Sequence, residues 1–310
     1  MSSRHRRAIC NCLGGSKPPL LVLAILCVFS GLTTRAFAGS LTGTETPADK
    51  RGFNLFNPTP ASSLRELSTD RPDKTESPYT VDAGHFQIEL DLLNYSYDRD
   101  SVDRADRTVE NFAIAPVNFK VGLLNNMDLQ IIVETYNIER TRARSARTRE
   151  EISGFGDVTV RWKTNLWGND GGETAFGVMP FVKFPTNQRG LGNDAVEGGI
   201  IFPLAIALPY DFGLGAMTEV DFVQDGENSD YHGEFINSIT VSHSIVGELS
   251  GYVEFFSSVS TERDAQWVGT FDFGFTYGIG PNVQLDAGMN VGLTRSADDL
   301  NPFVGLSVRY

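Results

Sequence analysis

The sequence is poor in residues that carry redox, metal or nucleophile chemistry. All three cysteines (Cys10, Cys12 and Cys27) lie within the first 38 residues. The rest of the chain can therefore form no disulfide, thiolate metal site or cysteine nucleophile. That remainder has three histidines, and it contains no Gly-x-Ser-x-Gly motif, no cluster of metal-ligand residues and no phosphate-binding loop. We therefore expect no enzyme, no cofactor and no bound metal.

Long apolar runs and excess positive charge are also absent. After residue 38 no run reaches the 18 consecutive apolar residues that would indicate a transmembrane helix. Five of the 26 Lys and Arg residues, but none of the 39 Asp and Glu residues, lie in the first 38 positions, which leaves 21 basic against 39 acidic residues. So acidic a chain lacks the basic surface that nucleic-acid binding requires. Nucleic acid is therefore not an expected partner.

Residues 1–38 have the pattern of a cleaved signal peptide. Basic residues precede the uncharged 13-residue run 20–32, and Ala36-Phe37-Ala38 forms a small-residue cleavage pattern before Gly39. Because a membrane-spanning helix needs about 20 residues, an uncleaved anchor is the weaker alternative. Residues 39–83 are polar and contain several prolines. We expect them to form a periplasmic N-terminal segment, because they cannot bury a core of their own.

Residues 84–310 alternate between apolar and polar side chains. In 283–293 the odd positions are Val, Leu, Ala, Met, Val and Leu, and the even positions are Gln, Asp, Gly, Asn and Gly. This period of two is typical of strands with one apolar and one polar face. The segments are longer than ordinary strands of about five or six residues, and they suit tilted membrane strands. Twelve segments lie near 84–97, 108–123, 127–139, 154–166, 173–185, 196–208, 212–224, 232–245, 248–260, 265–279, 282–294 and 300–310.

The connections between these segments alternate in length. Short turns are expected at 124–126, 168–172, 209–211, 246–247 and 280–281, and longer polar loops at 98–107, 140–153, 186–195, 225–231, 261–264 and 295–299. Short periplasmic turns, longer external loops and an even strand number are typical of outer-membrane barrels. We therefore predict an all-β, transmembrane, antiparallel up-and-down β-barrel of about 12 strands with both termini in the periplasm. A soluble sandwich or jelly roll is the competing fold, but its strands would be shorter.

One block of sequence resembles a known family. Ser68–Leu90 reads STDRPDKTESPYTVDAGHFQIEL and resembles the opening of the outer-membrane proteins of the phenol meta-degradation (MetA) pathway. Segments 154–166, 180–185 and 272–293 are similar to that family too, so the resemblance spans about 68–310. It implies an outer-membrane barrel that transports small, often aromatic or otherwise hydrophobic, molecules. The Arg-rich run 140–149 has no place in the family pattern.

If the apolar positions face lipid, alternation turns the charged positions toward the lumen. A Lys or Arg on the lipid face at mid-bilayer would cost roughly 2–4 kcal/mol. Two interpretations stay open: a hydrated pathway that selects solutes by charge and width, or a closed ladder of salt bridges that fills the lumen. Twelve strands are intermediate between filled and open barrels. The predicted lumen-lining residues are Glu89, Asp91, Lys120, Glu134, Arg161, Lys163, Lys183, Glu219, Asp221, Glu254, Asp272, Asp286 and Arg309.

Aromatic residues on the strands are interpreted as interfacial girdles rather than as a ligand site. The set comprises Phe176, Phe181, Phe184, Phe271, Phe273, Phe275, Trp162, Trp167 and Trp267.

Two charged runs outside the predicted strands need an explanation. The first precedes the first strand and contains Asp70, Arg71, Asp73, Lys74 and Glu76. Two interpretations stay open: it enters the periplasmic mouth or the lumen as a plug or gate, or it forms a strap that only seals the barrel floor. The second run lies in a predicted external loop and contains Arg140, Arg142, Arg144, Arg147 and Arg149. It could hold lipopolysaccharide phosphates, although charge runs are more often simply solvated.

The sequence therefore predicts an outer-membrane channel or facilitator for small, hydrophobic or aromatic solutes. Its expected partners are outer-membrane lipid, a small-molecule solute, and the barrel-assembly machinery, which would recognise the last strand ending at Tyr310. The first alternative is a closed structural outer-membrane barrel without transport. The second is a secreted soluble β-protein.

Cleavage after Ala38 can be tested directly. We expect protein isolated from membranes to begin at Gly39, because the small residues at positions 36 and 38 fit the signal-peptidase pattern. N-terminal sequencing and the intact mass report the site. A mature protein that retains residues 1–38 would show that the segment is an anchor.

Overall fold

The computed structural model describes residues 49–99, 106–192, 194–225 and 229–310. The predicted signal peptide lies outside these residues. The described part contains fifteen strands and one short 3₁₀ helix, η1 (Ala61–Ser63), and within it no helix has the length and hydropathy needed to cross a membrane. The strands are β1 (Phe86–Arg99), β2 (Arg107–Ile114), β3 (Val117–Leu124), β4 (Met127–Val133), β5 (Tyr136–Ala143), β6 (Thr148–Gly154), β7 (Val158–Trp167), β8 (Thr174–Phe184), β9 (Glu197–Leu208), β10 (Phe212–Gln224), β11 (Tyr231–Val246), β12 (Leu249–Ser260), β13 (Val268–Gly278), β14 (Val283–Gly292) and β15 (Leu300–Arg309).

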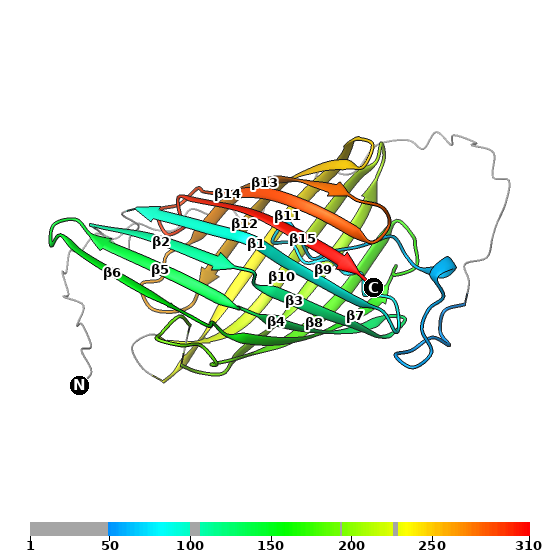
Figure 1. The fold of residues 1–310 in the computed structure, drawn as a ribbon, viewed down its shortest axis with the longest axis horizontal. Coiled ribbons are helices and arrows are strands. Elements are labelled where there is room, and N and C mark those ends of the chain that lie inside the picture. The colour runs from blue at the N-terminus through cyan, green and yellow to red at the C-terminus, as the bar shows by residue number, and fades with distance from the viewer. Residues whose placement is uncertain (1–48, 100–105, 193, 226–228) are drawn as a thin grey trace. The chain divides into compact units, whose positions relative to one another are not determined.

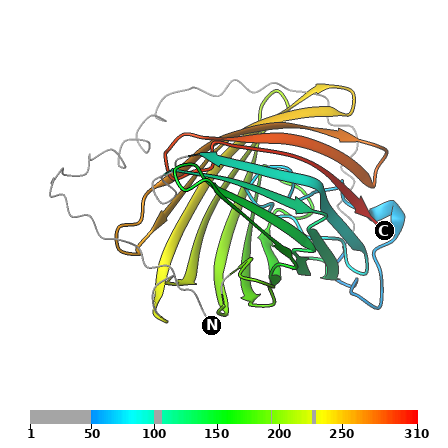
Figure 2. The ribbon, with the colours of Figure 1, turned by 60° about the vertical axis from the view of Figure 1, so that its left-hand side comes forward.

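The strands form one antiparallel sheet that closes into a barrel. Each strand pairs with its neighbours, and β15 pairs with β1 from Gln87–Arg309 to Tyr97–Leu300. Figures 1 and 2 show the last strand lying beside the first. Three barrel strands are each interrupted once, which gives the segments β2–β3, β4–β5 and β6–β7. The fifteen segments therefore make twelve barrel strands, and the predicted twelve-stranded all-β barrel is confirmed.

The interruption between β2 and β3 has a local cause. Pro116 lacks an amide hydrogen, and Ala115 adopts a positive φ of 52°, so the ladder cannot continue through these residues. In its pairing with β15, the strand β1 has a bulge between Asp91 and Leu93. The first part of β1 pairs with β3 and the second with β2. A bulge increases the local twist, which helps one strand follow both segments.

Most of the short turns lie at one end of the barrel and most of the longer loops at the other, as the sequence predicts. The loop prediction for 140–153 is wrong: residues 140–143 continue β5, residues 148–154 form β6, and the turn between them is 144–147. A run of charged residues predicts a loop. Backbone pairing of β5 with both β2 and β6 instead supports strand structure and lengthens the wall at the long-loop end (Figure 1).

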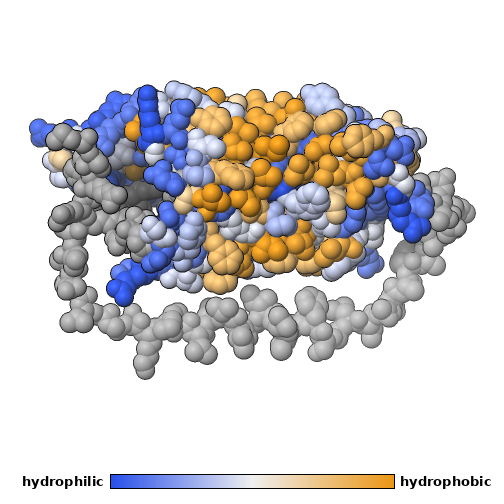
Figure 3. Space-filling view, turned by 90° about the horizontal axis from the view of Figure 1, so that it is seen from below, coloured by the Kyte–Doolittle hydropathy of each residue, from blue (hydrophilic) through white to orange (hydrophobic). Residues whose placement is uncertain are grey.

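The outer surface of the barrel is apolar around its middle. Figure 3 shows hydrophobic residues across the central part of one face, with hydrophilic residues toward both ends. Large apolar side chains such as Leu166 and Phe222 are 55% and 59% exposed. Soluble monomers rarely expose apolar patches of more than a few hundred Å², so this surface is typical of a barrel surrounded by lipid.

The interior is correspondingly polar. Glu89, Gln130, Lys163 and Asp272 are among the fully buried side chains, although charged residues are almost never buried in soluble proteins unless they are paired. The described chain begins at the short-turn end, where Leu55 N donates to the carbonyl of Leu123. Tyr310 ends at the same side, which is marked C in Figure 1.

We expect Val253→Arg to destabilise the folded barrel by about 2–4 kcal/mol in lipid vesicles, because Val253 is exposed on the outer face near the middle of β12. Val246→Arg is the matched control. Val246 is exposed at the end of β11, where a cationic side chain costs about 0–1 kcal/mol. Denaturant unfolding followed by tryptophan fluorescence measures both. Equal costs for the two variants would contradict a lipid-facing outer surface.

Candidate functional site

Residues 68–83, here called the lumenal segment, lie inside the barrel. The segment contacts side chains from ten strands: β1, β3, β4, β7, β10, β11, β12, β13, β14 and β15. A segment of this length can reach strands around the whole circumference of a closed barrel only from the interior. No residue of the lumenal segment belongs to a strand. It is therefore held mainly by side chains of the wall.

Asp70 is the most heavily contacted residue of this segment. Its carboxylate accepts hydrogen bonds from Lys120 and, at 2.6 Å, from Lys163 Nζ. Its amide donates to the Glu89 carboxylate at 3.2 Å, and Lys120 also pairs with Glu89. Burial raises the pKa of Asp70, but the two lysines outweigh that effect and hold the pKa well below its usual value. The result is a buried network that joins β1, β3 and β7 through one side chain.

Arg71 crosses to another part of the wall. Its guanidinium pairs with Asp91 on β1 and, at 2.7 Å, with Asp286 on β14. The same group lies 5.6 Å from the ring centroid of Phe303. Gly305 makes this approach feasible, because a Cβ there would lie 2.1 Å from Arg71 Nη2. Arg71 therefore holds the segment against β1, β14 and β15, beside the β1–β15 pairing that closes the barrel.

The next residues contact strands β11–β13. Lys74 Nζ is 3.1 Å from Asp272, and the Thr75 amide donates to Glu254 at 2.8 Å. The hydroxyls of Thr75 and Ser238 are 2.7 Å apart. Asp73 is half-buried here, and burial together with the Glu254 carboxylate raises its pKa to about 8. This part of the lumen is thus acidic, with Lys74 as a local counter-charge.

Glu76 returns the segment to the β7 side of the wall. It pairs with Arg161, and its amide donates to Met217 Sδ on β10 at 3.4 Å. Further along, Asn165 Nδ2 donates to the Pro78 carbonyl at 2.9 Å. The Val81 amide donates to Asp128 at 3.0 Å. The segment then leaves the lumen toward β1.

The predicted inward residues fall into two groups. Nine contact the lumenal segment: Glu89, Asp91, Lys120, Arg161, Lys163, Glu254, Asp272, Asp286 and Arg309. The other four lie elsewhere. Lys183 pairs with Glu197 at 2.6 Å, Glu219 is buried on β10, Asp221 lines a cavity, and Glu134 accepts from Asn137 at the break between β4 and β5.

The inner wall also carries an apolar strip that the sequence pattern did not predict. Met179, Ile201 and Met217 from β8, β9 and β10 form a buried cluster, and Phe181 and Ile236 pack against it. Met179 and Phe181 share the inner face of β8 with Lys183. The interpretation of Phe181 as a girdle residue is therefore wrong. β8 and β9 are apolar on both faces, so a period of two could not show which apolar side chains turn inward.

This apolar strip borders a cavity of about 240 Å³ on the long-loop side of Met179. Its lining combines Phe181 and Val223 with the charged residues Lys183, Glu197, Asp221 and Glu234. The Arg161 guanidinium lies 5.8 Å from the Phe181 ring centroid and also pairs with Glu76. The strip, the cavity and the lumenal segment therefore meet at one place. Within the described ranges no group of three His, Cys, Asp or Glu residues could hold a metal ion.

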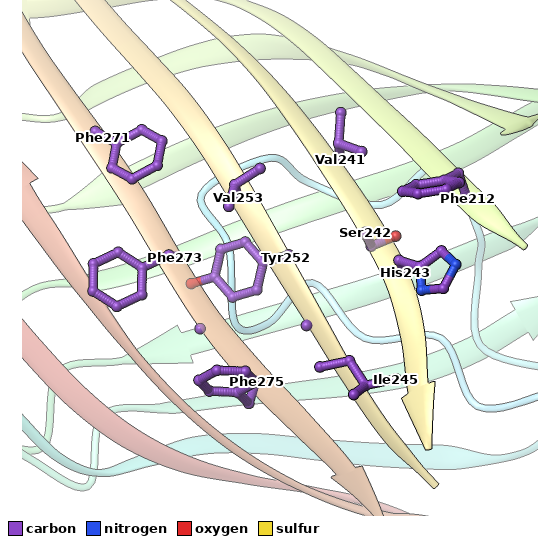
Figure 4. Close-up of a pocket in the computed structure, with 12 residues that line it drawn as sticks. Phe212, Val241, Ser242, His243, Ile245, Tyr252, Val253, Phe271, Phe273 and Phe275 are labelled. Atoms are coloured by element: carbon purple, nitrogen blue, oxygen red, sulfur yellow. The ribbon is translucent and has the colours of Figure 1, made fainter. Parts of the chain in front are cut away.

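A second cavity, of about 430 Å³, lies over β11, β12 and β13. Figure 4 shows Val253, Phe273, Phe275 and Ile245 around it, with Phe212 and His243 at one side. Most of these apolar side chains are exposed on the outer surface. This cavity therefore belongs to the outer face of the barrel rather than to the lumen.

Two solved structures of outer-membrane proteins are similar to this chain. The COG4313 outer membrane channel from Pseudomonas putida F1 is 12% identical, the match covers 78% of this chain and 100% of that one, and the TM-score is 0.54. The NanC porin is 11% identical over 71% of this chain and 98% of that one, with a TM-score of 0.45. At these identities the similarity to the channel shows a shared fold. No curated protein matches the sequence.

A family model covers the barrel and the lumenal segment together. The model is described as the putative MetA-pathway of phenol degradation, and it matches residues 69–310. The match begins within the charged block at Ser68–Glu76 and continues to Tyr310. On this evidence the chain belongs to the family of the putative MetA-pathway of phenol degradation.

Proposed function

We propose that the protein is an outer-membrane channel or facilitator for small hydrophobic or aromatic solutes. The observation that carries this proposal is the apolar strip of Met179, Ile201 and Met217 on the inner wall beside the lumenal segment. A pathway for ions and polar solutes alone needs only the charged lining that surrounds this strip. An apolar surface inside the lumen suits a solute that is itself apolar.

The expected free energy of solute binding to the apolar strip fits transport rather than storage. A small aromatic solute that buries about 100 Å² of apolar surface gains about 2.5 kcal/mol. Conduction requires binding strong enough for entry and weak enough for release. The charged residues Lys183, Asp221 and Glu234 at the adjoining cavity offer contacts for a polar substituent. We infer that small aromatic acids and phenols are suitable solutes.

The lumenal segment is proposed to act as a gate. Its residues belong to no strand, so the segment can move without breaking the barrel's backbone ladder. Buried ion pairs such as Asp70 with Lys163 contribute little net stability, because desolvation offsets much of their attraction. Water or a charged solute in the lumen would replace part of these contacts. The segment is thus firmly placed but not irreversibly bound.

The exposed apolar surface supports a location in the outer membrane with lipid around the barrel, and it argues against a secreted soluble protein. We propose that the short-turn end, with both Tyr310 and the lumenal segment, faces the periplasm. The barrel-assembly machinery would recognise β15, and no nucleic-acid partner is proposed. The remaining alternative is a closed structural barrel, which the occupied lumen favours.

Single-channel conductance of the refolded mature protein in planar bilayers separates the channel from the closed barrel. We expect conductance steps that small aromatic acids block in a concentration-dependent way. Deletion of residues 39–80 should enlarge the steps, because it removes most of the lumenal segment. A folded protein that stays silent in both forms would establish the structural role.

A disulfide between the lumenal segment and the wall tests the gate. Residues 39–310 contain no native cysteine, and the hydroxyls of Thr75 and Ser238 are 2.7 Å apart, so we choose the double variant Thr75→Cys with Ser238→Cys. We expect aromatic solute flux into proteoliposomes to fall at least about tenfold on oxidation and to recover on reduction, and thiol titration verifies the bond. Each single variant, treated identically, is the control. Equal flux in the oxidised and reduced forms would contradict movement of the segment.

The apolar strip can be tested with one inward substitution. Ile201→Asn places an amide in the cluster with Met179 and Met217, and we expect it to weaken block by aromatic acids about tenfold while salt conductance persists. The matched control is Val109→Asn, because Val109 is also buried but belongs to β2 and lies outside this cluster. Equal effects of the two variants on block would contradict the proposal that the strip lines the solute pathway.

A further inference from the structure

The outer face of the β5–β6 hairpin carries a cluster that transport does not use. It consists of Arg140, Arg142 and Arg149 with Glu110 and Glu151, and we call it the arginine face. In the pairing register Arg140 lies opposite Glu110 on one side and Glu151 on the other, while Arg142 lies directly opposite Arg149. Like charges directly opposite each other destabilise a sheet. The pair Arg142–Arg149 therefore favours a bound anion.

Alternation along β5 places the arginine face on the outside of the barrel. Residues at even positions share one face of this strand, and Tyr136 on that face is an exposed apolar residue. The neighbouring strands agree, because Phe112 pairs with Ile138 and with Tyr95. The side chains that follow, at 140 and 142, continue the same outer row toward the long-loop end.

The position along the strand corresponds to the edge of the apolar surface. The rings of Tyr95 and Phe112 lie 4.7 Å apart, and the Arg140 guanidinium lies 5.1 Å from the Phe112 centroid. The Tyr95 hydroxyl donates to Glu110 at 3.2 Å. Aromatic girdles mark the interface between hydrocarbon and headgroups. Arg142 is two residues beyond Arg140, which is about 7 Å along a strand, so it lies at the depth of lipid phosphates.

The two glutamates do not satisfy the three guanidinium groups. Glu151 Oε2 is 2.8 Å from Arg140 Nε and 3.8 Å from Arg149 Nη2, so one carboxylate serves two arginines. Arg142 Nη2 is 3.3 Å from Glu110. The Arg142 and Arg149 side chains remain 51% and 57% exposed. Each guanidinium has five donors, and most of those on Arg142 and Arg149 are available outside the barrel.

We propose that the arginine face binds the phosphate groups of lipopolysaccharide in the outer leaflet. This inference rests on the proposed outer-membrane location, which places the long-loop end on the external side. A phosphorylated lipid satisfies both parts of the surface: phosphate oxygens accept paired hydrogen bonds from arginine, and the acyl chains cover the apolar row at Tyr136 and Ile138. A free phosphate would use the arginines alone.

The test compares two variants with the same change in charge. Arg142→Gln with Arg149→Gln removes the opposed pair, and Arg263→Gln with Arg295→Gln is the control, because Arg263 and Arg295 are exposed in other loops at the long-loop end. The probe is purified lipopolysaccharide in phosphatidylcholine vesicles that hold the refolded full chain. Gel electrophoresis after heating shows the temperature at which the band of the folded barrel disappears. The readout is the lipopolysaccharide concentration that gives half of the maximal rise in this temperature.

We expect the wild type and the control to respond alike and the Arg142/Arg149 variant to need at least about tenfold more lipopolysaccharide, since charge-assisted hydrogen bonds are the strong ones. Without lipopolysaccharide the variant should be as stable as the wild type or more stable, because the like-charge repulsion is gone. Dephosphorylated lipopolysaccharide should act weakly on all proteins. Inorganic phosphate alone should not reproduce the effect.

Equal responses of the two variants, or of phosphorylated and dephosphorylated lipid, would overturn the proposal, and so would stabilisation by inorganic phosphate alone. Conductance recorded on the same preparations keeps this outcome separate from the proposed transport function. A protein that conducts but does not respond to lipopolysaccharide would contradict only the proposed role of the arginine face. A protein that binds lipopolysaccharide but shows no conductance would contradict only the proposed channel function.

Discussion

The pairing of β1 with β15 is the contact on which the remaining architecture depends. Backbone groups at a sheet edge cannot be left without partners in lipid, so a membrane-spanning sheet must close. Closure fixes which side chains turn inward and creates an interior that must be filled or hydrated. The positions of the charged residues, the lumenal segment and the apolar strip all follow from that division into an inner and an outer face.

The charged interior in turn determines how the lumenal segment is held. Lys120 and Lys163 are buried, and each needs a carboxylate that the wall supplies only in part. Asp70 provides the shared partner, while Arg71 does the same for Asp91 and Asp286. The segment therefore completes ion pairs that the twelve strands leave incomplete. This complementarity gives it a defined place while leaving the sheet itself intact.

The apolar strip and the arginine face extend the same logic to ligands. Both are places where a surface carries residues that its surroundings do not favour: apolar side chains in a polar lumen, and opposed arginines beside an apolar outer wall. In each case a molecule of matching chemistry relieves the mismatch. The first site suits a small aromatic solute and the second a phosphorylated lipid. The two proposed sites lie on opposite faces of the wall, so we expect them to have different partners.

The sequence alone determined the barrel and its strand number, and it predicted which charged residues turn inward, because a period of two assigns each residue to a face without reference to its neighbours. It also marked the charged block around Asp70 as a segment without a core. Only the tertiary structure decided that this block meets Lys120, Lys163 and Asp286, since the contacts join residues up to 215 positions apart. The inner apolar strip and the strand structure of 140–154 were also decided there. A strand that is apolar on both faces has no pattern that shows which face turns inward. Backbone pairing can hold a charged run in a sheet even where its composition predicts a loop.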